Sequence, residues 1–188
     1  KYLILSLFSG LLFGLSWPVN GIVFLIFVAF IPLLIIERGL REKSVFKIFS
    51  YSFLSFILWN SITSWWLVNS TIFGMFFAII LYSILMALVF AGYSLISKKL
   101  GGKLGVIFFI SSWIVFEKFN LSWEFSWPSL ILGNVFSESH QLIQWFEFTG
   151  TLGGSIWILI VNLLFFETLN KYLNNKYYLK NLSIGLLC

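Results

Sequence analysis

The chain has 188 residues, of which 60% are hydrophobic, 21% are aromatic and only 10% are charged. Soluble domains average roughly 45–50% apolar and about 25% charged residues, so 7 acidic and 12 basic side chains are too few to solvate a globule of this length. The composition excludes a water-soluble domain and predicts an all-α integral membrane protein, because helices satisfy their own backbone hydrogen bonds in lipid.

Six apolar stretches are predicted to form a bundle of transmembrane helices, since a bilayer core about 30 Å thick takes roughly 20 helical residues. They cover residues 2–17, 21–36, 45–67, 72–96, 104–119 and 151–169. A seventh apolar run opens at Leu179, where we expect the start of a seventh helix. The first two stretches form a hairpin through residues 17–20, whose Pro18 and Asn20 favour a turn. A signal peptide is the weaker alternative for the first stretch, because no Ala-x-Ala-like cleavage site follows it.

Eleven of the 12 basic residues follow alternate ends of these stretches, and Lys118 is the exception. The eleven are Lys1, Arg38, Arg41, Lys43, Lys47, Lys98, Lys99, Lys103, Lys171, Lys176 and Lys180. The positive-inside rule then predicts a multi-pass protein with its N-terminus and these loops in the cytoplasm. No nucleic-acid partner is expected, because short clusters between apolar runs do not form a basic face.

The segment from residue 120 to residue 150 is expected to be an interfacial element over the outer face of the bundle. It is too polar to span, yet its Trp123, Trp127 and Trp145 suit the headgroup zone, where an indole buries its ring and keeps its N–H wet. We expect a short helix over residues 138–148 that ends at Gly150. The candidate substrate-binding residues are Trp127, Asn134, Gln144 and Glu147. A structural cap and a lip that guides a lipid or lipidated substrate are equal alternatives for this segment.

Small and polar residues within the predicted helices are expected to hold the helices together. Ser6, Gly10 and Gly14 recur at four-residue spacing, which lets two helix backbones approach closely in lipid. Packing inside one bundle is favoured over a dimer contact. Asn60 and Asn162 are predicted to be hydrogen-bond partners between helices rather than substrate ligands.

An acidic and a basic residue, Glu117 and Lys118, close the fifth predicted helix near its outer end. Ionisable residues at membrane depth are functional candidates. The favoured alternative is an interfacial pair that anchors the helix, with Lys118 reaching the headgroups.

The sequence shows no catalytic or metal-binding constellation. Asp is absent, and there is one His, His140, and one Cys, Cys188. Neither a Ser-His-Asp triad nor a multi-histidine metal site can be assembled from such a set. We therefore assign no catalytic residue, no metal and no cofactor, and we interpret Cys188 as an inert thiol in an apolar run.

An ordered set of short motifs resembles the apolipoprotein N-acyltransferases of bacteria. The motifs are residues 126–134 (SWPSLILGN), 144–150 (QWFEFTG) and 153–157 (GGSIW), the hairpin at 14–18 with Pro32-Leu33-Leu34, Trp65-Trp66, and Trp113 with Glu117-Lys118. They cover nearly the whole chain in the order of the family. One departure is Ser129, because the family usually carries Trp after the Pro of this motif, and we assign no binding role to Ser129.

The resemblance implies an enzyme that moves an acyl chain from a phospholipid donor to the amino group of the N-terminal cysteine of a diacylated lipoprotein acceptor. In the family this reaction passes through a thioester on a nitrilase-type domain outside the membrane, where a Cys is the nucleophile, a Glu the base and a Lys the charge stabiliser. That domain follows the seventh helix, so none of these residues lies in this chain. Residues 1–188 are thus expected to be a multi-span membrane domain and a fragment of a longer protein.

Two other functions compete with this one. A small multi-span transporter or channel subunit is the alternative from a different class, and a scaffold without a substrate is the third. Transporters tend to show internal repeats and ionisable groups near the membrane midplane. Neither pattern is visible in the sequence.

Overall fold

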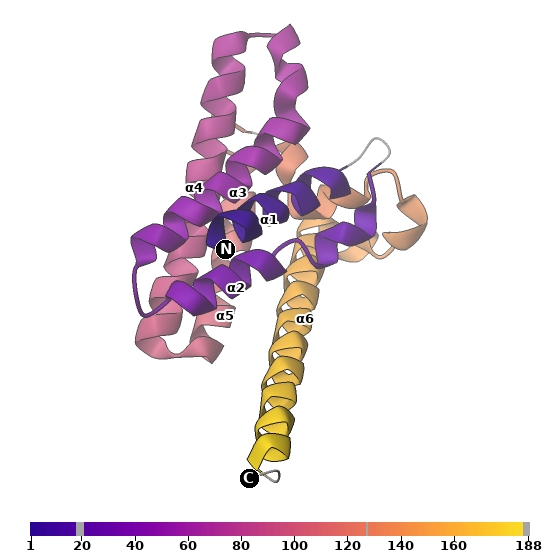
Figure 1. Ribbon diagram of the computed structural model, residues 1–188. Helices are drawn as coiled ribbons and strands as arrows, with labels where there is room; N and C mark the ends of the chain where they lie inside the picture. The colour runs from indigo at the N-terminus through magenta and orange to yellow at the C-terminus, as the bar shows by residue number, and fades with distance from the viewer. Residues whose placement is uncertain (18–20, 127, 186–188) are drawn as a thin grey trace.

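The computed structural model describes residues 1–17, 21–126 and 128–185, with the side chains of these residues except His140 and residues 174–185. Throughout this part the chain is helical, as predicted. The elements are α1 (Tyr2–Ser16), η1 (Val23–Phe27), α2 (Ile31–Leu40), α3 (Val45–Ser64), η2 (Trp65–Asn69), α4 (Ile72–Leu100), α5 (Gly102–Asn120), η3 (Pro128–Leu130), η4 (Leu132–Phe136), η5 (His140–Leu142) and α6 (Phe146–Gly185), where η marks a 3-10 helix. In Figure 1, α3 and α4 form a long hairpin and α6 projects from the bundle as a separate rod.

Four helical segments of the described part are long and apolar enough to cross a membrane. They are Val23–Leu40, Val45–Asn69, Ile72–Leu100 and Phe146–Leu173. The chain is therefore a multi-span membrane protein, but only four of the six predicted spans meet this standard. α1 is apolar but has only 15 residues. α5 carries Lys103, Glu117 and Lys118 within 19 residues, and these charges lower its apolar character.

The second predicted helix is interrupted between Phe27 and Ile31. Pro32 lies in the first turn of α2. A proline can open a helix but not continue one, because it lacks the N–H and its ring excludes the carbonyl four residues earlier. The backbone left open at this break is bonded by Asn162 of α6, which accepts from Phe30 N at 2.9 Å and donates to Ile26 O at 2.8 Å. The predicted interhelical role of Asn162 is confirmed.

α6 corrects two further predictions. A seventh helix was expected to start at Leu179, but the helix that follows the kink at Gly150 continues without a break to Gly185. No Gly or Pro lies between Gly154 and Gly185, so no strong helix breaker separates a sixth helix from a seventh. The short outer helix ends at Gly150 as predicted, but it begins at Phe146 rather than at 138. Gly150 has φ 65° and ψ −175°, a conformation essentially confined to glycine, and this residue kinks the helix.

Small residues bring α1 directly against α3. Ser6 Oγ donates to Tyr51 O at 2.6 Å. A Cβ atom added at Gly10 would lie 2.6 Å from Ser55 O, so α1 can approach this closely only without a side chain there. Gly14 packs in the same way against Ile62 of α3. The stripe predicted from the four-residue spacing is thus a contact inside one bundle.

Aromatic rings fill the centre where α1, α2, α3 and α5 meet. Phe13 stacks on Trp59 with ring centroids 4.6 Å apart, and Phe30 meets Trp113 edge to face at 5.1 Å. All four side chains are fully buried. Part of the unusual aromatic content therefore forms the core, not the outer face.

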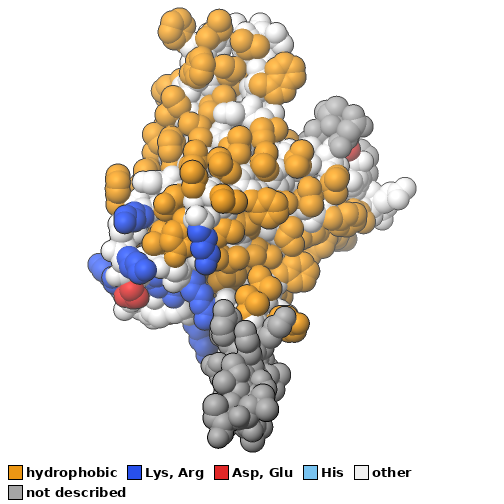
Figure 2. Space-filling view, viewed as in Figure 1, with side chains coloured by type: hydrophobic (Ala, Val, Ile, Leu, Met, Phe, Trp, Pro, Cys, Tyr) orange, Lys and Arg blue, Asp and Glu red, His pale blue; other side chains and the backbone are white. Residues whose placement is uncertain are grey.

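Seven basic residues around the α2–α3 and α4–α5 connections gather at one end of the bundle, which we call the basic end. It contains Arg38, Arg41, Lys43, Lys47, Lys98, Lys99 and Lys103, and blue side chains cluster there in Figure 2. Lys98 Nζ lies 3.5 Å from Glu42 Oε2 and so joins the two loops. Tyr2 packs against Gly39, which brings the chain start to the same end. The predicted sorting of these charges is seen, and their cytoplasmic side remains a prediction.

Candidate functional site

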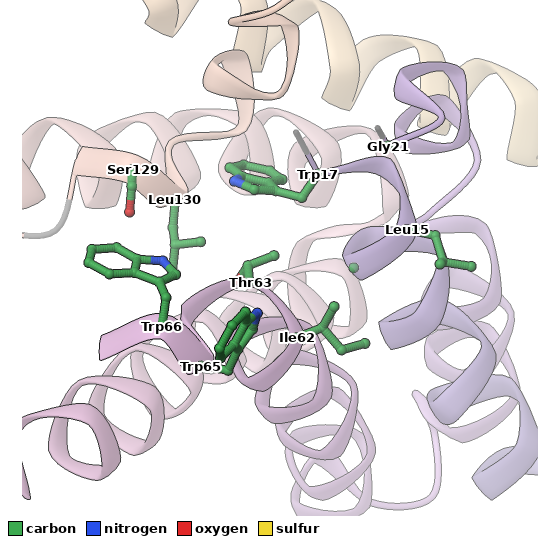
Figure 3. Close-up of a pocket in the computed structure, with 10 residues that line it drawn as sticks. Leu15, Trp17, Gly21, Ile62, Thr63, Trp65, Trp66, Ser129 and Leu130 are labelled. Carbon is green, nitrogen blue, oxygen red and sulfur yellow. The ribbon is translucent and has the colours of Figure 1, made fainter. Parts of the chain in front are cut away.

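A cavity of 660 Å³ lies at the end of the bundle opposite to the basic end, and we call it the tryptophan cavity (Figure 3). Its lining comes from the end of α1 and the turn after it, from the junction of α3 and η2, and from η3. The lining residues are Gly14, Leu15, Trp17, Gly21, Ile62, Thr63, Trp65, Trp66, Ser129 and Leu130. The indole rings of the three tryptophans are arranged around the space in Figure 3.

The three tryptophans connect the buried core to the exposed rim. Trp17 packs edge to face on buried Trp59 with ring centroids 5.3 Å apart. Trp65 and Trp66 are 64% and 48% exposed, so they present their rings to the surroundings.

The chemistry of the lining suits an amphiphile. All the described lining residues are uncharged, and most of them are apolar. Thr63 uses its hydroxyl to bond Trp59 O at 3.0 Å, so its polar group is already satisfied within α3. Indole rings pack against methylene chains, while their N–H groups can bond polar headgroups. The cavity can therefore accept an acyl chain without burying an unpaired charge.

The outer segment is fixed to the bundle by Glu117. This side chain is 1% exposed, and its Oε1 accepts from Trp113 Nε1 at 2.9 Å and from Leu132 N at 2.8 Å. The next backbone N–H, of Gly133, donates to Ser155 Oγ of α6 at 3.0 Å. η4 is thus held between α5 and α6. The expectation of an interfacial Glu117–Lys118 pair is wrong, because consecutive residues of a helix point in different directions and Glu117 points inward while Lys118 is exposed.

The predicted site residues are not brought together. Asn134 Nδ2 donates to Pro128 O at 2.6 Å, which steadies the turn that carries Ser129 to the cavity. Gln144 and Glu147 are exposed and do not line the cavity. Trp127 lies outside the described residues. A binding role for these four residues stays a prediction.

A second, shallower apolar groove of 530 Å³ lies beside Gln144 and Glu147. Its lining residues are Trp145, Thr149, Gly153, Ile156, Trp157 and Ile160. Trp145 donates its indole N–H to Leu142 O at 3.1 Å, and its ring lies edge to face with that of Trp157 at 5.7 Å. The outer segment therefore contributes to this apolar groove as well as to the tryptophan cavity.

None of the cavity residues Trp17, Trp65, Trp66 and Ser129 was predicted from the sequence to bind a substrate. Their position near the outer segment can be inferred from the order of the helices along the chain. With basic loops at one end, the turns after the first and third helices must share the other end with the outer segment. Ser129, where the family usually has Trp, is itself part of the lining.

The known proteins that match the chain agree with one another. Residues 9–164 match the family described as the apolipoprotein N-acyltransferase N-terminal domain. The apolipoprotein N-acyltransferase of Chlorobaculum tepidum is 27% identical over 167 residues, which cover 87% of this chain and 31% of that protein. The chain thus spans about a third of the length of this curated relative, and no solved structure matches it significantly. The matched residues include the whole lining of the tryptophan cavity, and the chain belongs to the apolipoprotein N-acyltransferase N-terminal domain family.

Proposed function

We propose that this chain is the membrane domain of an apolipoprotein N-acyltransferase. The whole enzyme would transfer an acyl chain from a phospholipid to the N-terminal cysteine amine of a diacylated lipoprotein. The observation that carries the proposal is the match of residues 9–164 to the N-terminal domain of that family. The protein would lie in the bacterial cytoplasmic membrane with its N-terminus and basic end in the cytoplasm, as the positive-inside rule predicts.

The tryptophan cavity gives this domain a task in the reaction. Both proposed substrates carry long acyl chains, and both have their polar groups at the membrane surface. Uncharged walls with indole rings at the rim suit such molecules. The cavity would receive an acyl chain from the bilayer and hold the attached headgroup at the outer end of the bundle.

The bond-making chemistry is proposed to lie outside residues 1–188. The chain lacks Asp and has one His and one Cys, so it offers few side chains that could form the activated nucleophile of covalent acyl transfer. It also spans only 31% of its Chlorobaculum tepidum relative. A nitrilase-type domain of the same polypeptide would supply the nucleophile, and it would dock at the end that carries the cavity.

An acyl-transfer assay tests this division of labour. The full polypeptide should convert a diacylated lipopeptide to the triacylated form in phospholipid vesicles, as measured by mass spectrometry. Residues 1–188 alone, in the same vesicles, should show no conversion, because they lack an activated nucleophile. Turnover by the 188-residue chain would contradict the location of the chemistry, and an inactive but folded full polypeptide would contradict the function.

Filling the cavity tests its role. Thr63→Trp places an indole in the lining, and we expect kcat/KM of the full polypeptide for the lipopeptide to fall at least about tenfold, which corresponds to about 1.4 kcal/mol. The matched control is Phe73→Trp on the same hairpin, where the side chain is 88% exposed and outside the cavity. The control should retain full activity, and both variants should retain the wild-type melting temperature. Equal activity of the two folded variants would remove the cavity from the mechanism.

A further inference from the structure

A second cavity, of 730 Å³, opens at the basic end between α2, α4, α5 and α6, and we call it the basic pocket. Its lining residues are Arg38, Arg41, Tyr93, Gly102, Lys103, Val106, Ile107, Phe166 and Glu167. It lies at the opposite end of α5 from the outer segment, so the proposed acyl-transfer function does not use it.

The cations of the basic pocket have N–H donors available for an anionic ligand. Arg41 binds the buried carboxylate of Glu37 through Nε at 2.7 Å and Nη2 at 2.8 Å and also interacts with Tyr93, so only some of its five N–H donors are left for other acceptors. Arg38 and Lys103 have no ion-pair partner among the described residues. Glu167 is the single carboxylate in the described lining, so three cations face one acidic group there.

The rest of the wall is mostly apolar. Val106, Ile107 and Phe166 continue the pocket along α5 and α6. Ile107 is 61% exposed, which shows that this wall is open to the side rather than enclosed by the bundle. A molecule that fits both parts has an anionic head and an apolar tail.

We propose that the basic pocket binds an anionic phospholipid from the membrane leaflet at the basic end. Its phosphate would lie among Arg38, Arg41 and Lys103, and one acyl chain would follow Val106 and Ile107. Arginine and lysine beside a membrane surface are the usual partners of such headgroups. Free inorganic phosphate shares the head chemistry, but it would leave the apolar wall without a partner.

Lipid retention measured by native mass spectrometry tests the proposal in the full polypeptide. In mild detergent, the wild type should bind phosphatidylglycerol more tightly than phosphatidylcholine, whose choline cancels the phosphate charge. The double variant Arg38→Gln/Lys103→Gln should bind phosphatidylglycerol roughly 10- to 30-fold more weakly, since each of these two cations would contact the headgroup directly and contribute a factor of about five. Arg41 is left unchanged because its loss would strand buried Glu37.

A matched control removes the same charge from the same end. Lys43→Gln/Lys99→Gln changes two exposed lysines outside the pocket lining and should leave the affinity within about threefold of wild type, because they lie at the same surface but contribute no direct contact. The conservative pair Arg38→Lys/Lys103→Arg should retain most of the preference and shows that the pocket still folds. A large excess of inorganic phosphate should not displace the lipid.

Three results would overturn the proposal. Equal loss of phosphatidylglycerol affinity in the two glutamine double variants would show that general surface charge, and not the basic pocket, attracts the lipid. Equal affinity for phosphatidylcholine would remove the anionic requirement. Displacement by inorganic phosphate would assign a simple anion site instead of a lipid site.

Discussion

Single polar side chains of this bundle bind backbone groups that its helices leave open. Asn162 makes three hydrogen bonds, two to the break between η1 and α2 and one to Ile158 O of its own helix at 2.9 Å. Glu117 binds Leu132 N at the start of η4. An unpaired backbone group in lipid costs several kcal/mol, so these two residues permit non-helical backbone within the membrane domain.

Replacing Glu117 should separate its role as an acceptor from its charge. Glu117→Leu leaves the N–H groups of Trp113 and Leu132 buried without a partner, and we expect a loss of about 2–4 kcal/mol in the free energy of unfolding. Glu117→Gln keeps an oxygen at the acceptor position and should cost less than about 1 kcal/mol. Denaturation in detergent measures both, and limited proteolysis of the outer segment should accelerate only in the leucine variant. If glutamine costs as much as leucine, the charge rather than the acceptor matters.

Between the helices, close packing and side-chain hydrogen bonds provide the stabilisation that the hydrophobic effect provides in a water-soluble protein. Lipid tails are as apolar as leucine, so helices gain little from burying apolar faces on one another. α1 meets α3 through small residues, and α3 meets α4 through Asn60, whose Nδ2 donates to Ser83 Oγ at 2.7 Å. The predicted interhelical role of Asn60 is therefore confirmed.

The α1–α3 contact can be tested with one methyl group. In Gly10→Ala the added Cβ would lie 2.6 Å from Ser55 O, a backbone atom that cannot rotate away. The helices must separate, and we expect a loss of about 1–3 kcal/mol. Gly102→Ala is the matched control, because a Cβ there meets nothing within 4 Å and the melting temperature should be unchanged or slightly higher. Equal melting temperatures for both variants would contradict the close packing.

Sequence patterns located features that depend on one helix and missed those that depend on several. The small-residue stripe and the two asparagines follow local rules, and the structure agrees with them, whereas only four of the six apolar stretches meet the length and hydropathy of a membrane span. Pro32 is itself a local signal for the break before α2, but the long apolar stretch around it led to the prediction of one continuous helix. The inward position of Glu117 and the cavity around Trp17 depend on how distant segments pack, which no spacing within one helix specifies.

For the whole molecule, we expect the segregation of charge to set the membrane orientation. Seven cations lie at the basic end, while the tryptophan cavity and the outer segment lie at the other. With this orientation, the tryptophan cavity and the proposed anionic-lipid pocket would face opposite leaflets. The two sites can therefore draw on separate pools of lipid.

Cysteine labelling of the full polypeptide in intact cells tests this orientation. With Cys188 and every other native cysteine of the full polypeptide replaced by Ser, Ser137→Cys should react with a membrane-impermeant maleimide, because Ser137 is exposed in the outer segment. Lys43→Cys, exposed at the basic end, should react only after the cells are permeabilised. Ser44 is a poorer site, since its hydroxyl accepts from Lys47 N at 3.3 Å and caps α3. The reverse labelling pattern would place the basic end outside, and both the docking side of the catalytic domain and the leaflet that supplies the basic pocket would then change with it.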